Sequence, residues 1–200
     1  MVLRRCCLIV FLVLLTRPAM GAAYTIEDGD TCDYFFLTSA DTLAMSGGMI
    51  TQDLSARDTS RADLYGGIIG YDVNAFDSCS INVYGTAILD DLRPYGSSII
   101  NLYGGSVVAL LVAQDQSIVN IYGYGFNYDP AGDGSLSGYW QHGAAFRITF
   151  GNVVGGDTHS HIQLHEIPEP ATLSLLALGL GGLALRRRQE RPRHNGRTRQ

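Results

Sequence analysis

A repeat of nineteen residues in the middle of the chain limits its fold more than any other feature. Four tyrosine–glycine pairs recur at this spacing, and they are Tyr65-Gly66, Tyr84-Gly85, Tyr103-Gly104 and Tyr122-Gly123. Apolar columns keep the same step, and a column of aspartate and asparagine lies two residues before the tyrosines. A constant period of this kind is typical of stacked structural repeats, each of which completes its core against its neighbours.

Each repeat contains short stretches in which apolar and polar residues alternate, as in Ile81-Asn82-Val83-Tyr84. Because side chains alternate along a strand, Ile81 and Val83 are predicted to face the core, and Asn82 and Tyr84 the outside. No stretch of the body shows a capped helical pattern. The sequence therefore predicts an all-β fold, a single short parallel β-solenoid with nineteen-residue coils spaced about 4.8 Å apart. A β-sandwich or a set of hairpins is the alternative, but neither requires a constant period.

The outward columns are predicted to form ladders along the solenoid. Asparagine amides at one position can hydrogen-bond from coil to coil, and the tyrosines would form an outward aromatic stripe. The glycine after each tyrosine is expected to supply either a conformation or a close approach that a Cβ forbids.

The limits of the repeat divide the body into parts. They are a degenerate first coil that caps one end, residues 22–45, the solenoid repeats, residues 46–123, and C-terminal capping strands, residues 124–166. Capping is expected because an open end exposes unpaired strand edges. The last part is predicted to hold a hairpin of residues 136–139 and 145–150, followed by a strand from about residue 159 to residue 166.

The N-terminus has the composition of a secretory signal peptide. Arg4 and Arg5 precede an apolar run over residues 6–15, and Ala19-Met20-Gly21 offers the small residues that signal peptidase requires. Residues 1–21 are therefore predicted to be a signal helix that signal peptidase removes. The rest of the chain is expected to be exported.

The C-terminus holds a second segment directed to the membrane. Pro168-Glu169-Pro170 precedes an apolar run over residues 171–185, and Arg186, Arg187 and Arg188 follow it as a stop-transfer cluster. The run is predicted to be a transmembrane helix of about 22 Å, shorter than the roughly 30 Å hydrocarbon core. Arginines near both ends of the chain place the body between them across the cytoplasmic membrane.

This order of parts resembles the PEP-CTERM sorting signal of Gram-negative bacteria that possess an exosortase. The resemblance covers residues 167–188 and implies that an exosortase-type processing enzyme recognises Pro168, Glu169 and Pro170. It also implies that the hydrophobic tail is removed and that the body reaches the cell surface or the extracellular matrix. Residues 189–200, expected to be a basic disordered tail, depart from the pattern because such signals usually end the chain. A membrane anchor that is never cut is the alternative.

The body is strongly acidic. Between Ala22 and Pro170 the chain has four arginines, no lysine and eighteen acidic residues, a formal charge of −14. This charge excludes a nucleic-acid-binding surface and suits solubility or contact with cations. Cys32 and Cys79 are the cysteines of this region, and in an oxidising compartment they either form a disulfide or remain as buried thiols.

The body offers few groups for metal or catalytic chemistry. His159, His161 and His165 are spaced to share a strand face, but His165 would lie about 13 to 14 Å from His161, too far for one ion. Two aspartate columns recur at the repeat spacing, and they are Asp53, Asp72 and Asp91, and Asp58, Asp77 and Asp115. Turn-favouring aspartate explains these columns better than bound calcium. No nucleophile motif or carboxylate pair is recognisable, so we expect no metal, no cofactor, no catalytic residue and no enzyme activity.

The tyrosine column is the candidate ligand surface. Tyr65, Tyr84, Tyr103 and Tyr122 would either form an aromatic platform for the sugar rings of an extracellular polysaccharide or simply stack and stiffen the rod. The leading hypothesis is an exported, non-enzymatic surface or extracellular-matrix protein. A carbohydrate-binding or adhesive module is the first alternative, and a β-helix enzyme that degrades polysaccharide is the second.

Overall fold

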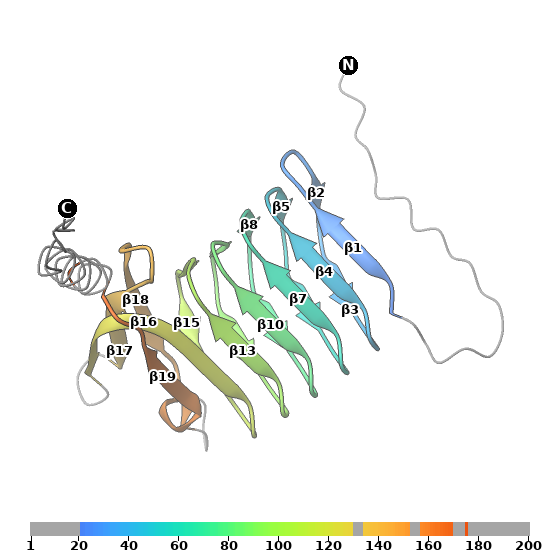
Figure 1. Cartoon of the computed structure of the whole chain (residues 1–200). Helices are drawn as coiled ribbons and strands as arrows, with labels where there is room; N and C mark the ends of the chain where they lie inside the picture. The colour runs from blue at the N-terminus through green and yellow to red at the C-terminus, as the bar shows by residue number, and fades with distance from the viewer. Residues whose placement is uncertain (1–20, 130–133, 153–156, 170–174, 176–200) are drawn as a thin grey trace, which may run out of the picture. The chain divides into compact units, whose positions relative to one another are not determined.

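The computed structural model describes residues 21–129, 134–152 and 157–169, together with residue 175 (Figure 1). Several sequence predictions lie outside these residues, and they are the signal peptide before residue 21, Pro170, nearly all of the apolar run, and Arg186, Arg187 and Arg188 with the tail behind them. Within the described part, no helix has the length and hydropathy that a membrane span requires. The body up to Ile167 is one compact unit.

The body is a parallel β-solenoid, as predicted, and each coil contributes three strands. The first face holds β1 (Ala23–Ile26), β4 (Thr42–Met45), β7 (Arg61–Leu64), β10 (Ser80–Val83) and β13 (Ile99–Leu102). The second face holds β2 (Thr31–Cys32), β5 (Met49–Ile50), β8 (Ile68–Ile69), β11 (Ala87–Ile88) and β14 (Ser106–Val107). The third face holds β3 (Phe35–Leu37), β6 (Leu54–Ala56), β9 (Val73–Ala75), β12 (Leu92–Pro94) and β15 (Leu110–Leu111).

Register and burial follow the predicted alternation. On the first face, strands pair residues nineteen positions apart, so that Ile81 lies beside Ile100. Ile81 is 0% and Val83 1% exposed, whereas Tyr84, the next outward residue, is 37% exposed. The core consists of stacked aliphatic columns, and their fully buried members include Ile50, Leu54, Leu64, Ile69, Ile88 and Leu92. Each coil therefore buries its apolar side chains only because another coil covers it.

The first coil is degenerate in sequence but complete in structure. Its three strands β1, β2 and β3 each pair in parallel with the matching strand of the second coil. Thr31 pairs with Met49, eighteen positions away, because one additional residue precedes β2 and one fewer follows it. The rings of Tyr24 and Phe35 meet edge to face at 5.3 Å between centroids and pack against the end of the core.

At the C-terminal end, strands that leave the repeat close the third face of the solenoid. β16 (Ile118–Asp129) runs on past its coil and pairs with β17 (Ser135–Tyr139), which forms the predicted hairpin with β18 (Ala145–Phe150). β18 then pairs in parallel with β15, so the hairpin joins the first face to the third. The indole of Trp140, in the hairpin turn, donates a hydrogen bond of 3.1 Å to the carbonyl oxygen of Gly105.

The final strand is shorter than predicted. Residues Thr158–His161 form the 3₁₀ turn η1, and only Ile162–Glu166 form β19, which pairs in parallel with β16. The carboxylate of Asp157 caps the turn by accepting the backbone N–H of His159. Such side-chain caps compete with an extended conformation and account for the later start of the strand.

Two adjacent glycine columns have different roles. Gly85 follows Tyr84 and has no positive φ, but a Cβ there would overlap the carbonyl oxygen of Tyr65 on the preceding coil. Positive φ falls one residue later, at Gly67 (89°) and Gly105 (82°). The predicted glycine column is therefore required because neighbouring backbones approach each other closely. The glycines one residue later are required because the backbone there has a positive φ.

Candidate functional site

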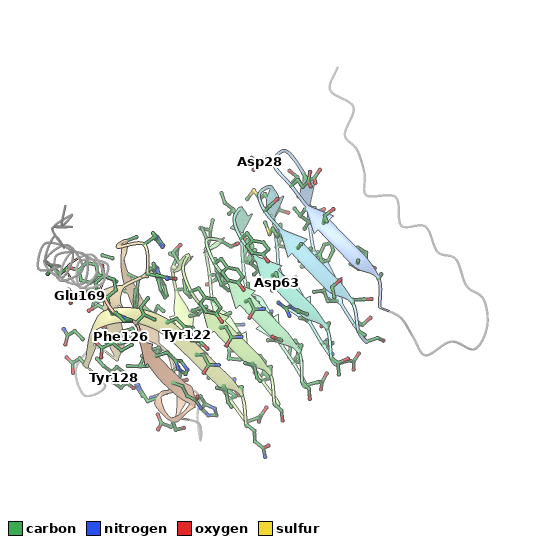
Figure 2. All side chains as sticks on the ribbon, viewed as in Figure 1. Asp28, Asp63, Tyr122, Phe126, Tyr128 and Glu169 are labelled. Carbon is green, nitrogen blue, oxygen red and sulfur yellow. The ribbon has the colours of Figure 1, made fainter. Side chains whose placement is uncertain are left out.

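The outward side of the first face carries the repeated polar and aromatic side chains, and we call it the ladder face. Its two columns are the asparagine ladder, Asp63, Asn82, Asn101 and Asn120, and the tyrosine ladder, Tyr65, Tyr84, Tyr103 and Tyr122. Figure 2 shows Asp63 on β7 and Tyr122 on β16, the two ends of this surface. The columns form because the strands pair without a register shift from β7 to β16.

The asparagine ladder is a continuous chain of hydrogen bonds across four coils. The amide of Asn101 donates to Asn82 at 2.7 Å, and the amide of Asn120 donates to Asn101 at 2.8 Å. The amide of Asn82 in turn donates to the carboxylate of Asp63 at 2.7 Å, and Arg61 holds this carboxylate through two guanidinium nitrogens. This arrangement agrees with the predicted stacking of amides, and its charged end is exposed at Arg61.

Replacing Asn101 with alanine is expected to lower the free energy of unfolding by about 1–3 kcal/mol. The substitution leaves the Asn82 carbonyl oxygen and the Asn120 amide without their ladder partner, and Asn82 is buried. Urea denaturation of the purified protein measures the change. Asn127→Ala is the control because Asn127 is exposed on β16 beyond the ladder. Equal stability of the two variants would contradict a structural role of the ladder.

The tyrosine rings stack face to face along the solenoid. Ring centroids lie 4.8 Å apart from Tyr65 to Tyr84, 5.0 Å from Tyr84 to Tyr103 and 4.4 Å from Tyr103 to Tyr122. The imidazole of His165, on β19, continues the stack at 4.5 Å from Tyr122. Burial, and then the hydrogen bond with Tyr122, raise the pKa of Tyr103.

This stacking decides which part of the rings a ligand can reach. The faces of Tyr84, Tyr103 and Tyr122 are covered on both sides by neighbouring rings, and only Tyr65 ends the row. Stacking of a sugar on an aromatic ring requires a free face, whereas the ladder presents ring edges and a row of hydroxyls. Sugar rings could therefore stack only on the outer face of Tyr65, and polysaccharide binding by this column stays a prediction.

The three histidines that were predicted to share a strand face, His159, His161 and His165, make separate contacts. His165 Nε2 lies 2.9 Å from Asn120 Oδ1 and so ends both ladders. His161 Nδ1 lies 2.8 Å from the carbonyl oxygen of Ser117, and His159 Nδ1 contacts the hydroxyl of Tyr128. His159 and His161 lie in η1 rather than on a strand, so the predicted common strand face is wrong. The role of His165 was missed in the sequence because it follows Tyr122 by 43 residues instead of nineteen and so lies outside the repeat.

The aspartate columns hold neighbouring coils together. The carboxylate of Asp53 accepts the backbone N–H of Asp72 at 3.1 Å, and that of Asp77 accepts the N–H of Asp58 at 3.2 Å. Asp58, Asp77 and Asp115 have φ values of 58°, 57° and 60°. Because aspartate tolerates this left-handed conformation better than most residues, the turn interpretation of that column is confirmed.

Among the described residues, one group of carboxylates is close enough to hold a cation. Ligand oxygens of Asp72, Asp90 and Asp91 lie within 4.8 Å of one another. Arg93 pairs with two of these three carboxylates, because its guanidinium nitrogens lie 2.6 Å from Asp72 and 2.6 Å from Asp91, and it offsets one of their negative charges. Burial raises the pKa of Asp72. The pairing of Arg93 with Asp91 could be inferred from their i, i+2 spacing on a strand, but its contact with Asp72 on the preceding coil depends on register.

No disulfide joins Cys32 to Cys79. Cys79 is buried in the core, and burial raises the pKa of its thiol to about 11. Cys32 is only half-buried, and its sulfur lies 4.0 Å from the carbonyl oxygen of Met49.

A thiol reagent at pH 8 is expected to modify Cys32 in the folded protein and to leave Cys79 unmodified. The thiolate is the reactive species, and Cys79 is almost entirely protonated at this pH and shielded by the core. Mass spectrometry of the labelled protein, with and without denaturant, measures both sites. Rapid labelling of Cys79 without denaturant would contradict its place in the core.

A cavity of about 150 Å³ lies where the hairpin meets the solenoid. Its apolar lining includes Val83, Leu102, Val107, Trp140, Phe146 and Ile148. Ser106 and Arg147 are its polar side chains, and the lining holds no carboxylate, histidine or cysteine. The cavity therefore contains no acid/base pair or nucleophile–base pair of the kind that catalysis requires.

The sorting tripeptide begins directly after the body. The N–H of Ile167 donates to the carbonyl oxygen of Gly123 at 2.8 Å, which is the last backbone hydrogen bond of β19 with β16. Pro168 follows and has no N–H with which to extend the strand. Pro168 and Glu169 are exposed.

Comparison with known proteins identifies this segment. Residues 166–188 match the PEP-CTERM protein-sorting motif, in agreement with the predicted range of 167–188. The motif implies that the chain is exported and is processed by an exosortase. No curated protein and no solved structure matches the chain.

Proposed function

Because the chain carries a PEP-CTERM protein-sorting motif, we propose that it is a non-enzymatic protein of the cell surface or extracellular matrix, released from its hydrophobic tail by cleavage at Pro168-Glu169-Pro170. The observation that carries the proposal is the position of the tripeptide of this motif, which only Ile167 separates from the last strand of a folded solenoid. The folded part is then the portion of the protein that is delivered, and its surface supplies the function.

Three features of the body support a structural role. The outward polar columns are used for contacts between coils, as the asparagine ladder shows. The carboxylates of Asp72 and Asp91 are paired with Arg93. Backbone N–H groups bind further aspartates, among them Asp53 and Asp77. Side chains engaged in this way hold neighbouring coils together, which supports a structural role.

Mass spectrometry of the protein recovered from its own cells tests the sorting half of the proposal. We expect a C-terminus near Pro170 in the surface or matrix fraction, and an uncut chain in the membrane fraction of cells that lack the exosortase. An intact C-terminus at Gln200 in all fractions would instead identify a permanent anchor. Incubation with acidic polysaccharides tests the other half, since release of sugar fragments would make the protein an enzyme.

Binding of an extracellular polysaccharide by the ladder face is the second candidate function. It is favoured by the exposed ring edges of the tyrosine ladder, of which Tyr65 and Tyr84 are the most exposed. Replacing Tyr84 and Tyr103 with phenylalanine removes hydroxyls but keeps the ring stack, whereas alanine removes both. If hydroxyls bind the sugar, the phenylalanine variant loses retention on polysaccharide while the fold survives. Full retention by that variant would exclude recognition through the hydroxyls.

A further inference from the structure

The first face of the solenoid ends in an unpaired strand edge at both ends. Among the described strands, β1 pairs only with β4, and β19 pairs only with β16. Figure 1 shows β1 and β19 at opposite ends of the solenoid. Both strands run in the same direction because every pair between them on this face is parallel. Free edges of this kind are templates for pairing with another chain.

The backbone groups that β1 leaves unpaired follow from its bonds to β4. The N–H of Thr42 donates to the carbonyl oxygen of Ala22, and that of Ser46 to Ile26. Because backbone groups point alternately to the two sides of a parallel strand, the groups of Ala23 and Thr25 point to the open side. β1 contains no charged residue and no proline, the usual means of blocking an edge.

The edge of β19 has the complementary pattern. The N–H of Ile167 donates to Gly123 on β16, so the backbone groups of Ile162 and Leu164 point to the open side. Leu164 is 39% exposed although it lies in a core column. The last strand therefore leaves both hydrogen-bonding groups and an apolar side chain uncovered.

The two edges also share a register. Successive strand pairs place Ile162 in the column of Tyr24, and Leu164 in the column of Ile26. A β1 strand added to β19 would thus cover Leu164 with Ile26 and keep every outward side chain outward. The joint repeats the contact that one coil already makes with the next.

Charge disfavours the alternative joint between two N-terminal ends. Residues 22–41 contain five acidic residues and no basic residue, so two N-terminal coils repel each other. In the shared register Glu27 meets His165 instead. Asp28, which occupies the column of Glu166, directs its carboxylate over Gly47 on its own second coil, because a Cβ built on Gly47 would overlap it.

We propose that the partner of the β1 edge is the β19 edge of a second copy of this chain. Parallel addition of β1 to β19 continues the first face from one molecule into the next. The contact joins two different surfaces, so it does not close on itself and repeats into a linear assembly. This self-association goes beyond the proposed sorting function and does not depend on the cleavage step.

Disulfide trapping between two labelled variants tests the joint. Thr25 and Gln163 are exposed and share a column, so cysteines at these positions on two copies would lie within disulfide range. The variants Thr25→Cys and Gln163→Cys, each with Cys32→Ser, are purified from exporting cells, mixed and oxidised. We expect covalent dimers in the mixture and at least tenfold fewer in either variant alone. Dimers of Thr25→Cys alone would show a joint between two N-terminal ends and overturn the proposal.

Sedimentation of variants without new cysteines gives a second measurement. The average molecular mass of the wild-type species in solution is expected to rise with protein concentration. Leu164→Lys is expected to raise the dissociation constant of the association at least tenfold. Ile68→Lys is the matched control because Ile68 is 39% exposed, like Leu164, but lies on β8 in the third coil, away from both edges. A wild-type protein that stays monomeric up to millimolar concentration, or equal weakening by both substitutions, would overturn the proposal. Circular dichroism confirms that each variant is folded.

Discussion

Replacing Ile81 with alanine is expected to lower the free energy of unfolding of the body by about 2–5 kcal/mol. Ile81 is 0% exposed in the fourth coil, and its column neighbours are Ala62 and Ile100 on adjacent coils. A cavity at this point has rigid strands on both sides and cannot collapse without shifting their register. The loss includes both the transfer free energy of the missing carbons and the cost of the cavity.

Urea denaturation followed by circular dichroism measures this effect. Leu89→Ala is the matched control, since Leu89 is 45% exposed one residue after β11 and its truncation is expected to change the stability by at most about 0.5 kcal/mol. A single sharp transition that moves to lower urea in the Ile81 variant would also show that the coils unfold together. Similar stability of the two variants would contradict the burial of Ile81 in a continuous core.

Replacing Glu169 with alanine is expected to abolish production of the processed protein. Glu169 is exposed immediately beyond the folded body and lies within the sorting motif of residues 166–188. Loss of its carboxylate removes the charged group of the tripeptide, so we expect uncut chains to accumulate in the membrane fraction. Quantitative mass spectrometry of the C-terminal peptide in each fraction measures the result.

Glu27→Ala serves as the control for this experiment. It removes the same carboxylate from an exposed position at the opposite end of the body and leaves the sorting motif unchanged. Its processing is expected to equal that of the wild-type chain. Normal processing of the Glu169 variant would mean that the enzyme does not require this carboxylate.

The central coils could be predicted because one local pattern is repeated at a constant spacing. A residue such as Ile81 is predicted to face the core by its alternation with Asn82, and its partner Ile100 by the nineteen-residue step. Neither prediction needs knowledge of a distant part of the chain. For the same reason the spacing of the tyrosines and asparagines is enough to place both ladders on one face.

The ends of the solenoid could not be predicted in the same way, because the repeat stops there. The pairing of β18 with β15 joins residues Thr149 and Leu110, which share no sequence period. The stacking of His165 on Tyr122 depends likewise on the parallel pairing of β19 with β16. The sequence indicated a hairpin and a final strand, but not the strands on which they would close.

By itself the sequence determined the parallel solenoid, its period, its inward and outward columns and the sorting motif at its end. All of these follow from residues at regular spacing or from a short contiguous motif. Tertiary structure alone decided that the tyrosine faces are covered by one another, that Arg93 pairs with Asp72, and that β1 and β19 keep open edges among the described strands. The physical reason is that these contacts depend on the distance between coils and on the way the chain closes its last turn, which no alternation along the chain encodes.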